Sequence, residues 1–217
     1  MSEKKLPHYD HNYGYSSETR VKILTETLKL FAFKGFAAVS MKDIAKAAGI
    51  KTSSIYNYYN SKDALLEDVL VQSEKRYWHY LNWLSAENAK AETLKQLVDN
   101  MINEEIIGMK DPISCFAISF ILKEQHSNPS VRRYVFELFW DHSIKSMKND
   151  FDAAIERGII PPCDTKVIAT TLLFNIIATN DMRIHEYMGF KPLVNTQEVY
   201  DGLKKLLTIL LSQGQKD

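Results

Sequence analysis

The sequence predicts an all-α protein. Only eight glycines and six prolines occur in 217 residues, which favours long helices. Apolar residues recur at helical spacing, as in Val21, Leu24, Leu28 and Phe31, which belong to a first helix running from about residue 17 to residue 34. Helix-capping and helix-ending residues separate such stretches along the rest of the chain. We therefore expect successive helices joined by turns.

The stretch from residue 40 to residue 65 predicts two short helices separated by a tight turn and followed by the start of a third. Ser40 followed by Asp43 fits a capping box, in which a hydroxyl and a carboxylate cover exposed backbone N–H groups. Ile44 begins an apolar stripe, and Gly49 supplies the backbone freedom needed where that helix ends. The pattern is a helix-turn-helix, a unit that places its second helix in the major groove of DNA.

The second short helix begins near Lys51 or Thr52, and it is too short and too polar to be stable without its neighbours. Ile55 and Tyr59, four residues apart, form its inward face. The other side chains carry hydroxyl, amide and phenol groups, which suit base edges and phosphate oxygens. Ser61 is expected to cap the helix that follows.

The order of residues in this segment is also informative, because it contains Ile44-Ala45, Ala48-Gly49-Ile50, Ser53-Ser54-Ile55-Tyr56, Tyr58-Tyr59 and Lys62-Asp63-Ala64-Leu65. Residues 17–70 thereby resemble the DNA-binding motif of the TetR family of one-component transcriptional regulators. A generic Ala-Gly turn between two helices is the alternative, but it does not account for the agreement on both sides of the turn. The chain departs from the family pattern at Lys51, where a small hydroxyl residue is common, at Ser53, where glycine is common, and at Tyr58-Tyr59, where His-Phe is common.

The resemblance implies an N-terminal three-helix DNA-binding head that contains the helix-turn-helix, and a C-terminal helical body that binds a ligand and dimerises. We expect a flexible N-terminal arm at 1–15, the DNA-binding domain at 16–62, and the effector-binding and dimerisation domain at 63–217. Residues 16–60 hold seven Lys or Arg against three acidic residues, whereas residues 61–217 hold 18 against 22. A basic head on an acidic body favours docking on DNA through one end, although the asymmetry is modest and ordinary surface scatter is the alternative.

We expect the second short helix to contact base edges, and the lysines and hydroxyl groups near the turn to contact phosphates. The start of the helix after Ser61 is a further phosphate contact, because helix N-termini attract anions. The candidate DNA-binding residues are Ser40, Lys42, Lys51, Thr52, Ser53, Tyr56, Asn57, Tyr58 and Lys62.

Later helices are marked by caps and breakers. Asp111-Pro112 and Asn128-Pro129 each place a capping residue before a proline at the first helical position. Asp164 is expected to cap the next helix, and Asn195 to open the last.

The last two helices predict a dimer. The helix around residues 168–177 is apolar nearly all round and must be covered on both sides, by its own subunit and by a partner. The final helix carries an apolar stripe, and two such helices from each subunit make a four-helix bundle, as the resemblance also implies. A large monomeric core is the alternative. The candidate dimerisation residues are Leu172, Ile176, Val199, Leu203, Leu206 and Leu210.

Residues 75–190 are rich in large side chains, which at helical spacing belong more often to a core than to a pocket. The resemblance nevertheless implies a small apolar or amphipathic ligand among these helices, held by a few polar groups. The candidate ligand-binding residues are Trp83, Phe116, Phe120, His126, Trp140, Asn175 and Asp181.

The function these features predict is a ligand-responsive, homodimeric repressor that binds a double-stranded DNA operator and is released by a small molecule. A ligand-independent activator or architectural DNA-binding protein is the alternative. An enzyme in the helical body is a remote third, because no nucleophile elbow, phosphate loop or pair of carboxylates at useful spacing occurs. No cofactor is expected, and neither the histidines nor Cys115 and Cys163 have the spacing of metal ligands.

The sequence also bears on location. No run of 18 or more apolar residues predicts a membrane span, and the first 15 residues have no apolar segment typical of a secretory signal. We therefore expect a cytoplasmic protein with reduced cysteines and no membrane partner.

Overall fold

The computed structural model describes the backbone of residues 17–108, 112–187, 189, 191 and 195–212; it describes their side chains except those of 103–108, 112, 115, 137–138, 180–181 and 183–187. Every regular element in these residues is helical, so the predicted all-α fold is confirmed. The elements are α1 (Glu18–Lys34), α2 (Met41–Ala48), α3 (Thr52–Ile55), α4 (Lys62–Asn88), α5 (Leu94–Gly108), α6 (Pro112–Glu124), α7 (Pro129–Arg133), the π-helical η1 (Tyr134–Trp140), α8 (Asp141–Glu156), α9 (Thr165–Tyr187) and α10 (Thr196–Ser212).

Helices begin where the capping residues predict. The Ser17 hydroxyl accepts a hydrogen bond from the Arg20 N–H at the start of α1. The capping box is present at the start of α2, where Ser40 and Asp43 each accept from the other's backbone N–H. At the start of α7 the Asn128 side chain accepts from the first free N–H groups of the helix. These local bonds fix the helix boundaries independently of tertiary packing.

The chain forms two compact units. Unit 1 comprises Met1–Trp78 and Pro112–Glu137, and unit 2 comprises His79–Asp111 and Leu138–Asp217. Unit 1 therefore contains α6, α7 and the first part of α4 in addition to α1, α2 and α3, so these units do not divide the chain after residue 62. This grouping follows from packing, because α6 contacts α1.

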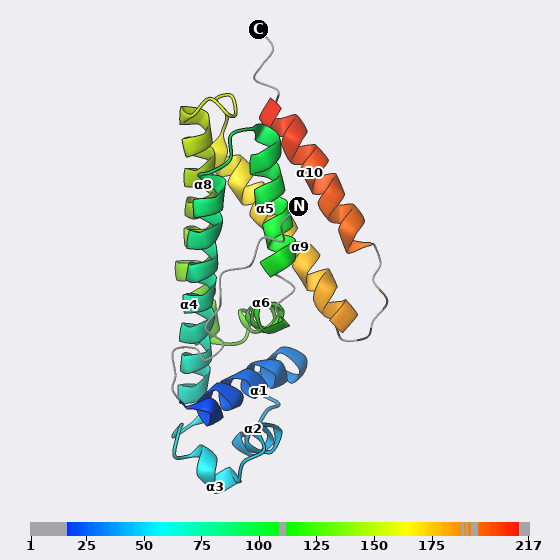
Figure 1. Ribbon diagram of the computed structural model, residues 1–217. Helices are drawn as coiled ribbons and strands as arrows, with labels where there is room; N and C mark the ends of the chain where they lie inside the picture. The colour runs from blue at the N-terminus through cyan, green and yellow to red at the C-terminus, as the bar shows by residue number, and fades with distance from the viewer. Residues whose placement is uncertain (1–16, 109–111, 188, 190, 192–194, 213–217) are drawn as a thin grey trace. The chain divides into compact units, whose positions relative to one another are not determined.

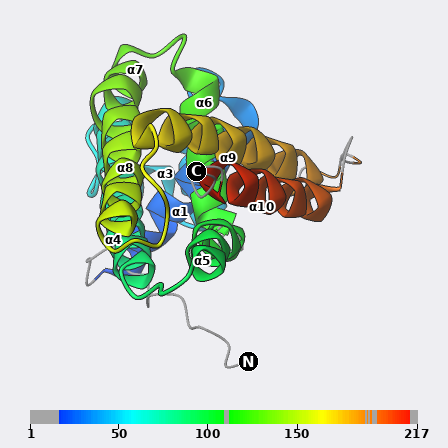
Figure 2. The same ribbon diagram turned by 90° about the horizontal axis from the view of Figure 1, so that it is seen from above.

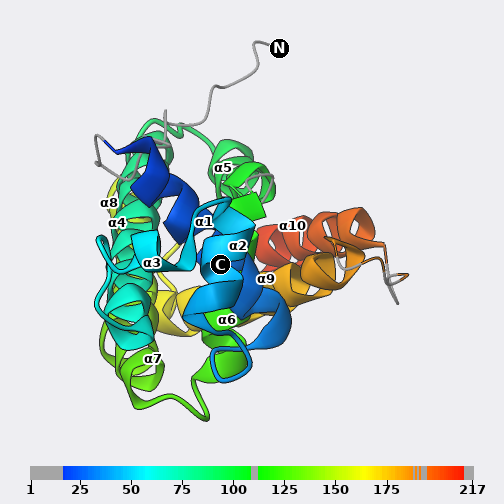
Figure 3. The same cartoon turned by 90° about the horizontal axis from the view of Figure 1, so that it is seen from below.

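The core of unit 1 forms around α1, which packs against both α2 and α6. Figure 3 shows α1, α2 and α3 of this unit. Phe31 is fully buried, and the centroid of its ring lies 5.3 Å from that of Phe120 on α6. Ile44 and Ile55 bring the short helices α2 and α3 into the same core. A long helix thus supports two helices that are too short to be stable alone.

Unit 2 is built around α9. The helix α8 packs against α9, and α10 packs against both α5 and α9, as Figures 1 and 2 show. One face of α10 enters this core through Tyr200, Leu203, Leu207 and Leu211, which are all buried. Their spacing is that of a single helix face.

A buried carboxylate lies where α4 meets α8 in unit 2. Asp150 accepts hydrogen bonds from the Ser85 hydroxyl over 2.5 Å and from the Asn88 side-chain amide over 2.8 Å. Beside it, the Arg157 guanidinium donates to three backbone carbonyl oxygens at the end of α4 and just after it, including those of Asn88 and Ala89. The guanidinium thereby caps the carbonyl groups at the end of α4 and just after it.

Asp150 is expected to make stability depend on pH. Burial raises the pKa of this carboxyl above its usual value, although the bonds from Ser85 and Asn88 oppose the shift. The folded protein therefore holds this proton at pH values where the unfolded chain, with a pKa of about 3.9, has lost it. Stability should fall as pH rises through that interval. The side chain of the Asp150→Asn variant does not titrate, so this fall in stability is absent. Its free energy of unfolding in urea should therefore vary less between about pH 4 and 7 than that of the wild type. Parallel profiles would contradict the assignment.

Within the described part of the chain, no helix is long and apolar enough to span a bilayer. The same residues contain no group of three or more histidine, cysteine, aspartate or glutamate side chains placed to hold a metal ion. Cys163 is a free thiol, and the side chain of Cys115 lies outside the described residues.

Candidate nucleic-acid interface

The turn between α2 and α3 depends on Gly49. Its φ of 72° and ψ of 28° are left-handed helical values, and its N–H donates to carbonyl oxygens at the end of α2. The following N–H, of Ile50, donates to the carbonyl of Ala45 over 2.9 Å. A side chain at Gly49 would be strained in this conformation, so the residue fixes the angle between the two short helices.

The helix α3 presents nearly all of its polar side chains to solvent. Its inward face consists of Ile55 and, just beyond the helix, Tyr59, and both are buried as predicted. Tyr56 and Tyr58, by contrast, are 50% and 36% exposed. The predicted DNA-contacting residues that lie exposed on and around α3 are Lys51, Thr52, Ser53, Tyr56, Asn57 and Tyr58.

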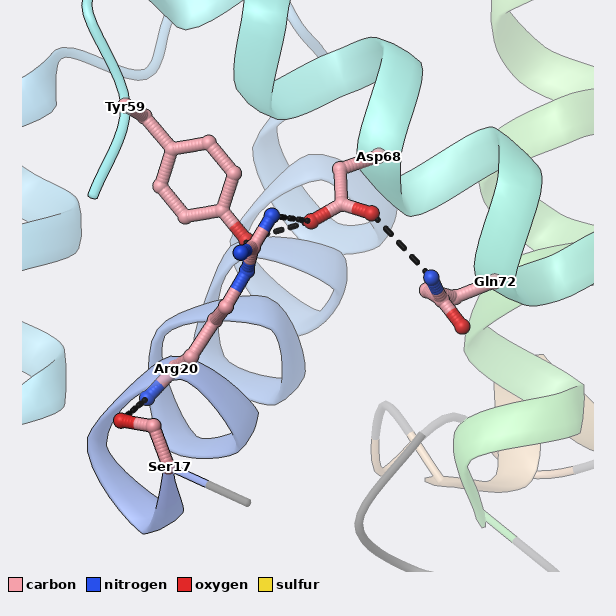
Figure 4. Close-up of polar contacts among 5 residues, drawn as sticks. All are labelled: Ser17, Arg20, Tyr59, Asp68 and Gln72. Carbon is pink, nitrogen blue, oxygen red and sulfur yellow. Dashed lines mark hydrogen bonds and ion pairs between the residues drawn. The ribbon is translucent and has the colours of Figure 1, made fainter. Parts of the chain in front are cut away.

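A polar network fixes the end of this segment against α1 and α4, as Figure 4 shows. The Tyr59 hydroxyl donates to Oδ2 of Asp68 over 2.6 Å and accepts from Nε of Arg20 over 3.1 Å. Arg20 also forms an ion pair with the same carboxylate oxygen at 3.1 Å. Gln72 donates to the other carboxylate oxygen over 3.2 Å. Side chains from α1, from α4 and from the segment that follows α3 thus meet at one carboxylate.

The network also accounts for the tyrosine at position 59, where phenylalanine is common in similar sequences. A buried hydroxyl group needs partners, and here it has both a donor and an acceptor. Burial, followed by the hydrogen bond to Asp68, raises the pKa of the Tyr59 phenol well above its usual value. The phenol therefore remains a hydrogen-bond donor throughout the neutral pH range.

Tyr59→Phe is expected to lower the free energy of unfolding by about 1 kcal/mol, the usual net value of a hydrogen bond. The ring and its packing remain, and the Arg20–Asp68 ion pair still compensates the carboxylate. The measurement is urea denaturation followed by circular dichroism. A variant as stable as the wild type would show that the hydroxyl contributes nothing to holding α3.

Two predicted DNA-contacting residues have structural partners of their own. The Ser40 hydroxyl donates to Oδ2 of Asp43 over 2.6 Å in addition to capping α2, so it is already engaged. The Lys62 ammonium donates to the carbonyl oxygens of Phe36 and Val39, and it lies 4.2 Å from the centroid of the Phe36 ring. Lys42, by contrast, is exposed. The two engaged side chains therefore support the α1–α2 loop and α2 directly.

The candidate ligand-binding residues divide between the two units. Phe116 and Phe120 are buried in unit 1, where their rings lie 5.3 Å from those of Phe33 and Phe31 on α1. His126 is exposed in the same unit. Both phenylalanines therefore contribute to the packing of α6 on α1.

The other ligand candidates belong to unit 2 or lie outside the described residues. Trp83 and Trp140 are half-buried, and the Trp140 ring stacks on Phe174 of α9 with centroids 4.8 Å apart. The Asn175 amide donates to the carbonyl of Thr171 within α9. The side chain of Asp181 is among those not described.

The candidate dimerisation residues divide between core and surface. Leu172, Ile176 and Leu203 are buried within unit 2, where α9 packs against α8 and α10 packs against α5 and α9. Val199 is half-buried. Leu206 and Leu210 are 46% and 41% exposed, so they are the members of the set that remain available to a partner.

Sequence reasoning missed Arg20, Asp68 and Glu124. The tyrosine at position 59 was a signal for the first two, since a hydroxyl on an inward face requires polar neighbours. Glu124 carried no comparable signal, because its partner Phe36 is 88 residues away in the sequence.

Comparison with known proteins bears on the same segment. Residues 23–69 match the family model described as bacterial regulatory proteins, tetR family. The HTH-type transcriptional regulator UidR of Escherichia coli K12 is 34% identical over 67 residues, which are 31% of this chain and 34% of UidR. The chain thus matches about a third of the length of that relative.

Two further comparisons extend beyond the helix-turn-helix. IcaR of Staphylococcus aureus strain Newman, described as a negative transcriptional regulator of the icaADBC biofilm operon, is 28% identical over 146 residues, covering 62% of this chain and 76% of IcaR. The structure of AibR in complex with isovaleryl coenzyme A and operator DNA is similar in fold, with a TM-score of 0.64, 18% identity, and coverage of 88% of this chain and 98% of AibR. The exposed α3, the family model and these relatives agree: residues 23–69 match the DNA-binding segment of bacterial regulatory proteins of the tetR family, and the chain is similar in fold to such regulators.

Proposed function

We propose that this protein is a homodimeric repressor that binds a roughly palindromic DNA operator and is released from it by a small molecule. Each subunit places α3 in the major groove, and the two α3 helices lie about 34–36 Å apart along the DNA, or somewhat more. The effector favours a spacing of the heads that does not fit the operator, which requires different affinities for the two states.

The exposed face of α3 is the observation that carries this proposal. A four-residue helix has few buried contacts of its own, and yet two tyrosines beside it are exposed. Hydroxyl, amide and phenol groups can read base edges, and the exposed Lys42 and Lys51 can neutralise phosphates. The repressor role is supported by the similarity to IcaR, whose description is that of a negative regulator.

The dimer is proposed to form through one surface of unit 2, the α9–α10 apolar face. It consists of large apolar side chains that are exposed on these two neighbouring helices: Val167, Phe174, Leu206, Ile209 and Leu210. Gly202 lies on α10 one turn before Leu206, and a Cβ added there would meet no atom within 4 Å. A second copy of α10 can therefore approach closely, and the two pairs of helices form a four-helix bundle about a two-fold axis.

The effector is proposed to be a small amphipathic molecule bound in the helical body. Support comes from AibR, whose complex contains isovaleryl coenzyme A together with operator DNA. Among the residues predicted to bind a ligand, Trp83, Trp140 and Asn175 of unit 2 are retained as candidates, because their side chains are only half-buried. The proposed regions remain an arm at 1–15, a DNA-binding domain at 16–62 and an effector and dimerisation domain at 63–217.

A ligand-independent activator or architectural protein is the second candidate, and catalysis in the helical body is not proposed. The deciding experiment is selection of bound sequences from a random DNA pool, followed by affinity measurements on the enriched site at several salt concentrations. A palindromic site bound about a thousandfold more tightly than random DNA supports the proposal, and its affinity should fall steeply with salt. Weak binding without an enriched sequence would reject a sequence-specific regulator. Failure of every metabolite tested to release the DNA would favour the second candidate.

A further inference from the structure

Charged side chains from two other helices of unit 1 hold the loop between α1 and α2, residues 35–39. The Phe36 N–H donates to Oε1 of Glu124, at the end of α6, over 2.8 Å. The Lys62 ammonium, in the first turn of α4, donates to the carbonyl oxygens of Phe36 and Val39, each over 2.8 Å. A carboxylate and an ammonium therefore satisfy the N–H and the C=O of the same residue.

Glu124 is built into this position. It is 8% exposed, and its second carboxylate oxygen accepts from the Ser127 hydroxyl over 2.9 Å. Gly35 allows the approach, because a Cβ at this residue would lie 2.8 Å from Oε1 of Glu124. Gly35 also has a φ of 81°, which residues with side chains rarely adopt. Both the turn and the carboxylate contact therefore require glycine here.

The loop determines where α2 begins. Val39 is buried, and the next residue, Ser40, is the N-cap of α2. The helix α2 packs in turn against α1 and α3. The Phe36 N–H is partly buried, and a partly buried N–H that loses its acceptor favours rearrangement of the backbone that carries it. Rearrangement of this loop would displace α2 and, with it, the exposed face of α3.

We propose that Glu124 is a positioning residue for DNA docking, acting from α6 on the α1–α2 loop and through that loop on α2 and α3. Lys62 supports the same loop from α4, so its contribution to DNA binding includes this contact as well as any contact with phosphate. The inference rests on the proposed DNA-binding function and adds to it a residue that lies outside the segment matched by the family model.

Comparison of Glu124→Ala with Glu124→Gln tests the role of the acceptor. Glutamine keeps an oxygen for the Phe36 N–H and an amide that can donate to Ser127, whereas alanine keeps neither. Both changes remove a negative charge, which by itself favours DNA binding, so a loss of affinity reports geometry. With the selected operator at fixed salt, we expect Glu124→Ala to bind about tenfold more weakly and Glu124→Gln to stay within about twofold of the wild type.

A second glycine with positive φ provides a control for placing a side chain at such a position. Gly35→Ala and Gly158→Ala both place a side chain at positive φ, 81° and 70° respectively. Only Gly35→Ala also pushes on Glu124, since a Cβ at Gly158 meets nothing within 4 Å. Both variants should lose stability, but at a temperature where both remain folded only Gly35→Ala should lose operator affinity.

Hydrogen exchange of the peptide that contains Phe36 gives a readout independent of DNA. We expect faster exchange in Glu124→Ala and wild-type exchange in Glu124→Gln. Unchanged affinity and unchanged exchange in Glu124→Ala would overturn the inference, as would equal loss of affinity in both variants. If the wild type selects no DNA sequence, the proposed function fails. Hydrogen exchange alone then tests the contact between Glu124 and the α1–α2 loop. Faster exchange in Glu124→Ala but not in Glu124→Gln would support this contact, and unchanged exchange in Glu124→Ala would reject it.

Discussion

Replacing both Leu206 and Leu210 with glutamate is expected to convert the proposed dimer into a monomer and to weaken operator binding by about a hundredfold or more. The two leucines lie one turn apart on α10 and are substantially exposed. In a two-fold interface each substitution occurs twice, so four carboxylates enter one apolar contact. Burying unpaired charges of one sign is strongly unfavourable. A monomer then binds only one half-site at a time and loses the gain from simultaneous engagement.

The fold of the subunit should survive this change, because the side chains that dock α10 on α5 and α9 are different ones, including Leu207 and Leu211. Sedimentation velocity reports the oligomeric state, and circular dichroism reports the helix content. Val71→Glu is the control, since Val71 is also an exposed apolar residue but lies on α4, in unit 1. A double variant that still sediments as a dimer would place the interface elsewhere.

Helix boundaries and the helix-turn-helix could be predicted from the sequence because short-range chemistry determines them. The Ser40–Asp43 capping box and the left-handed Gly49 each involve groups within four residues of one another. Asp164 and Asn195 likewise accept from N–H groups of the first turns of α9 and α10. Each of these signals is complete within one turn of helix, so tertiary packing was not needed to interpret it.

The inward side of α10 could not be predicted in the same way. Its leucines cover a wide arc, and the apolar stripe predicted from the sequence contains both Leu203, which is buried, and Leu206, which is exposed. Helical spacing alone cannot distinguish two adjacent apolar faces of one helix. Packing against α5 and α9 decides which face is inside.

Contacts between residues far apart in the sequence could not be predicted from it either. Phe116 and Phe120 are candidate ligand residues, and the structure shows that they also pack on the phenylalanines of α1. Lys62 is a candidate phosphate contact, and the structure shows that its ammonium also binds two loop carbonyls. The contact of Glu124 with the α1–α2 loop has no counterpart in the sequence pattern. In each case the partner lies on another helix or on the loop between helices, and nothing in the local pattern identifies it.

Tyr56→Ala is expected to weaken operator binding by about a hundredfold while leaving the dimer and its stability nearly unchanged. Half of the Tyr56 side chain is exposed, so little packing is lost within the subunit. A dimer presents this residue twice, and each base contact contributes about 1–3 kcal/mol, so the two losses together are of this size. Fluorescence anisotropy with the selected operator measures the effect. Tyr56→Phe separates the contribution of the hydroxyl from that of the ring.

Tyr59, three residues later, is the internal control for this prediction. Both residues are tyrosines at the end of α3, but Tyr59 is buried and hydrogen-bonded to Asp68 and Arg20, whereas Tyr56 faces solvent. Removing the Tyr59 hydroxyl should therefore lower stability and affect affinity only through the position of α3. Removing the Tyr56 side chain should lower affinity with little effect on stability. If Tyr56→Ala binds the operator as tightly as the wild type, the exposed face of α3 is not the DNA-reading surface, and the docking proposal fails at its main support.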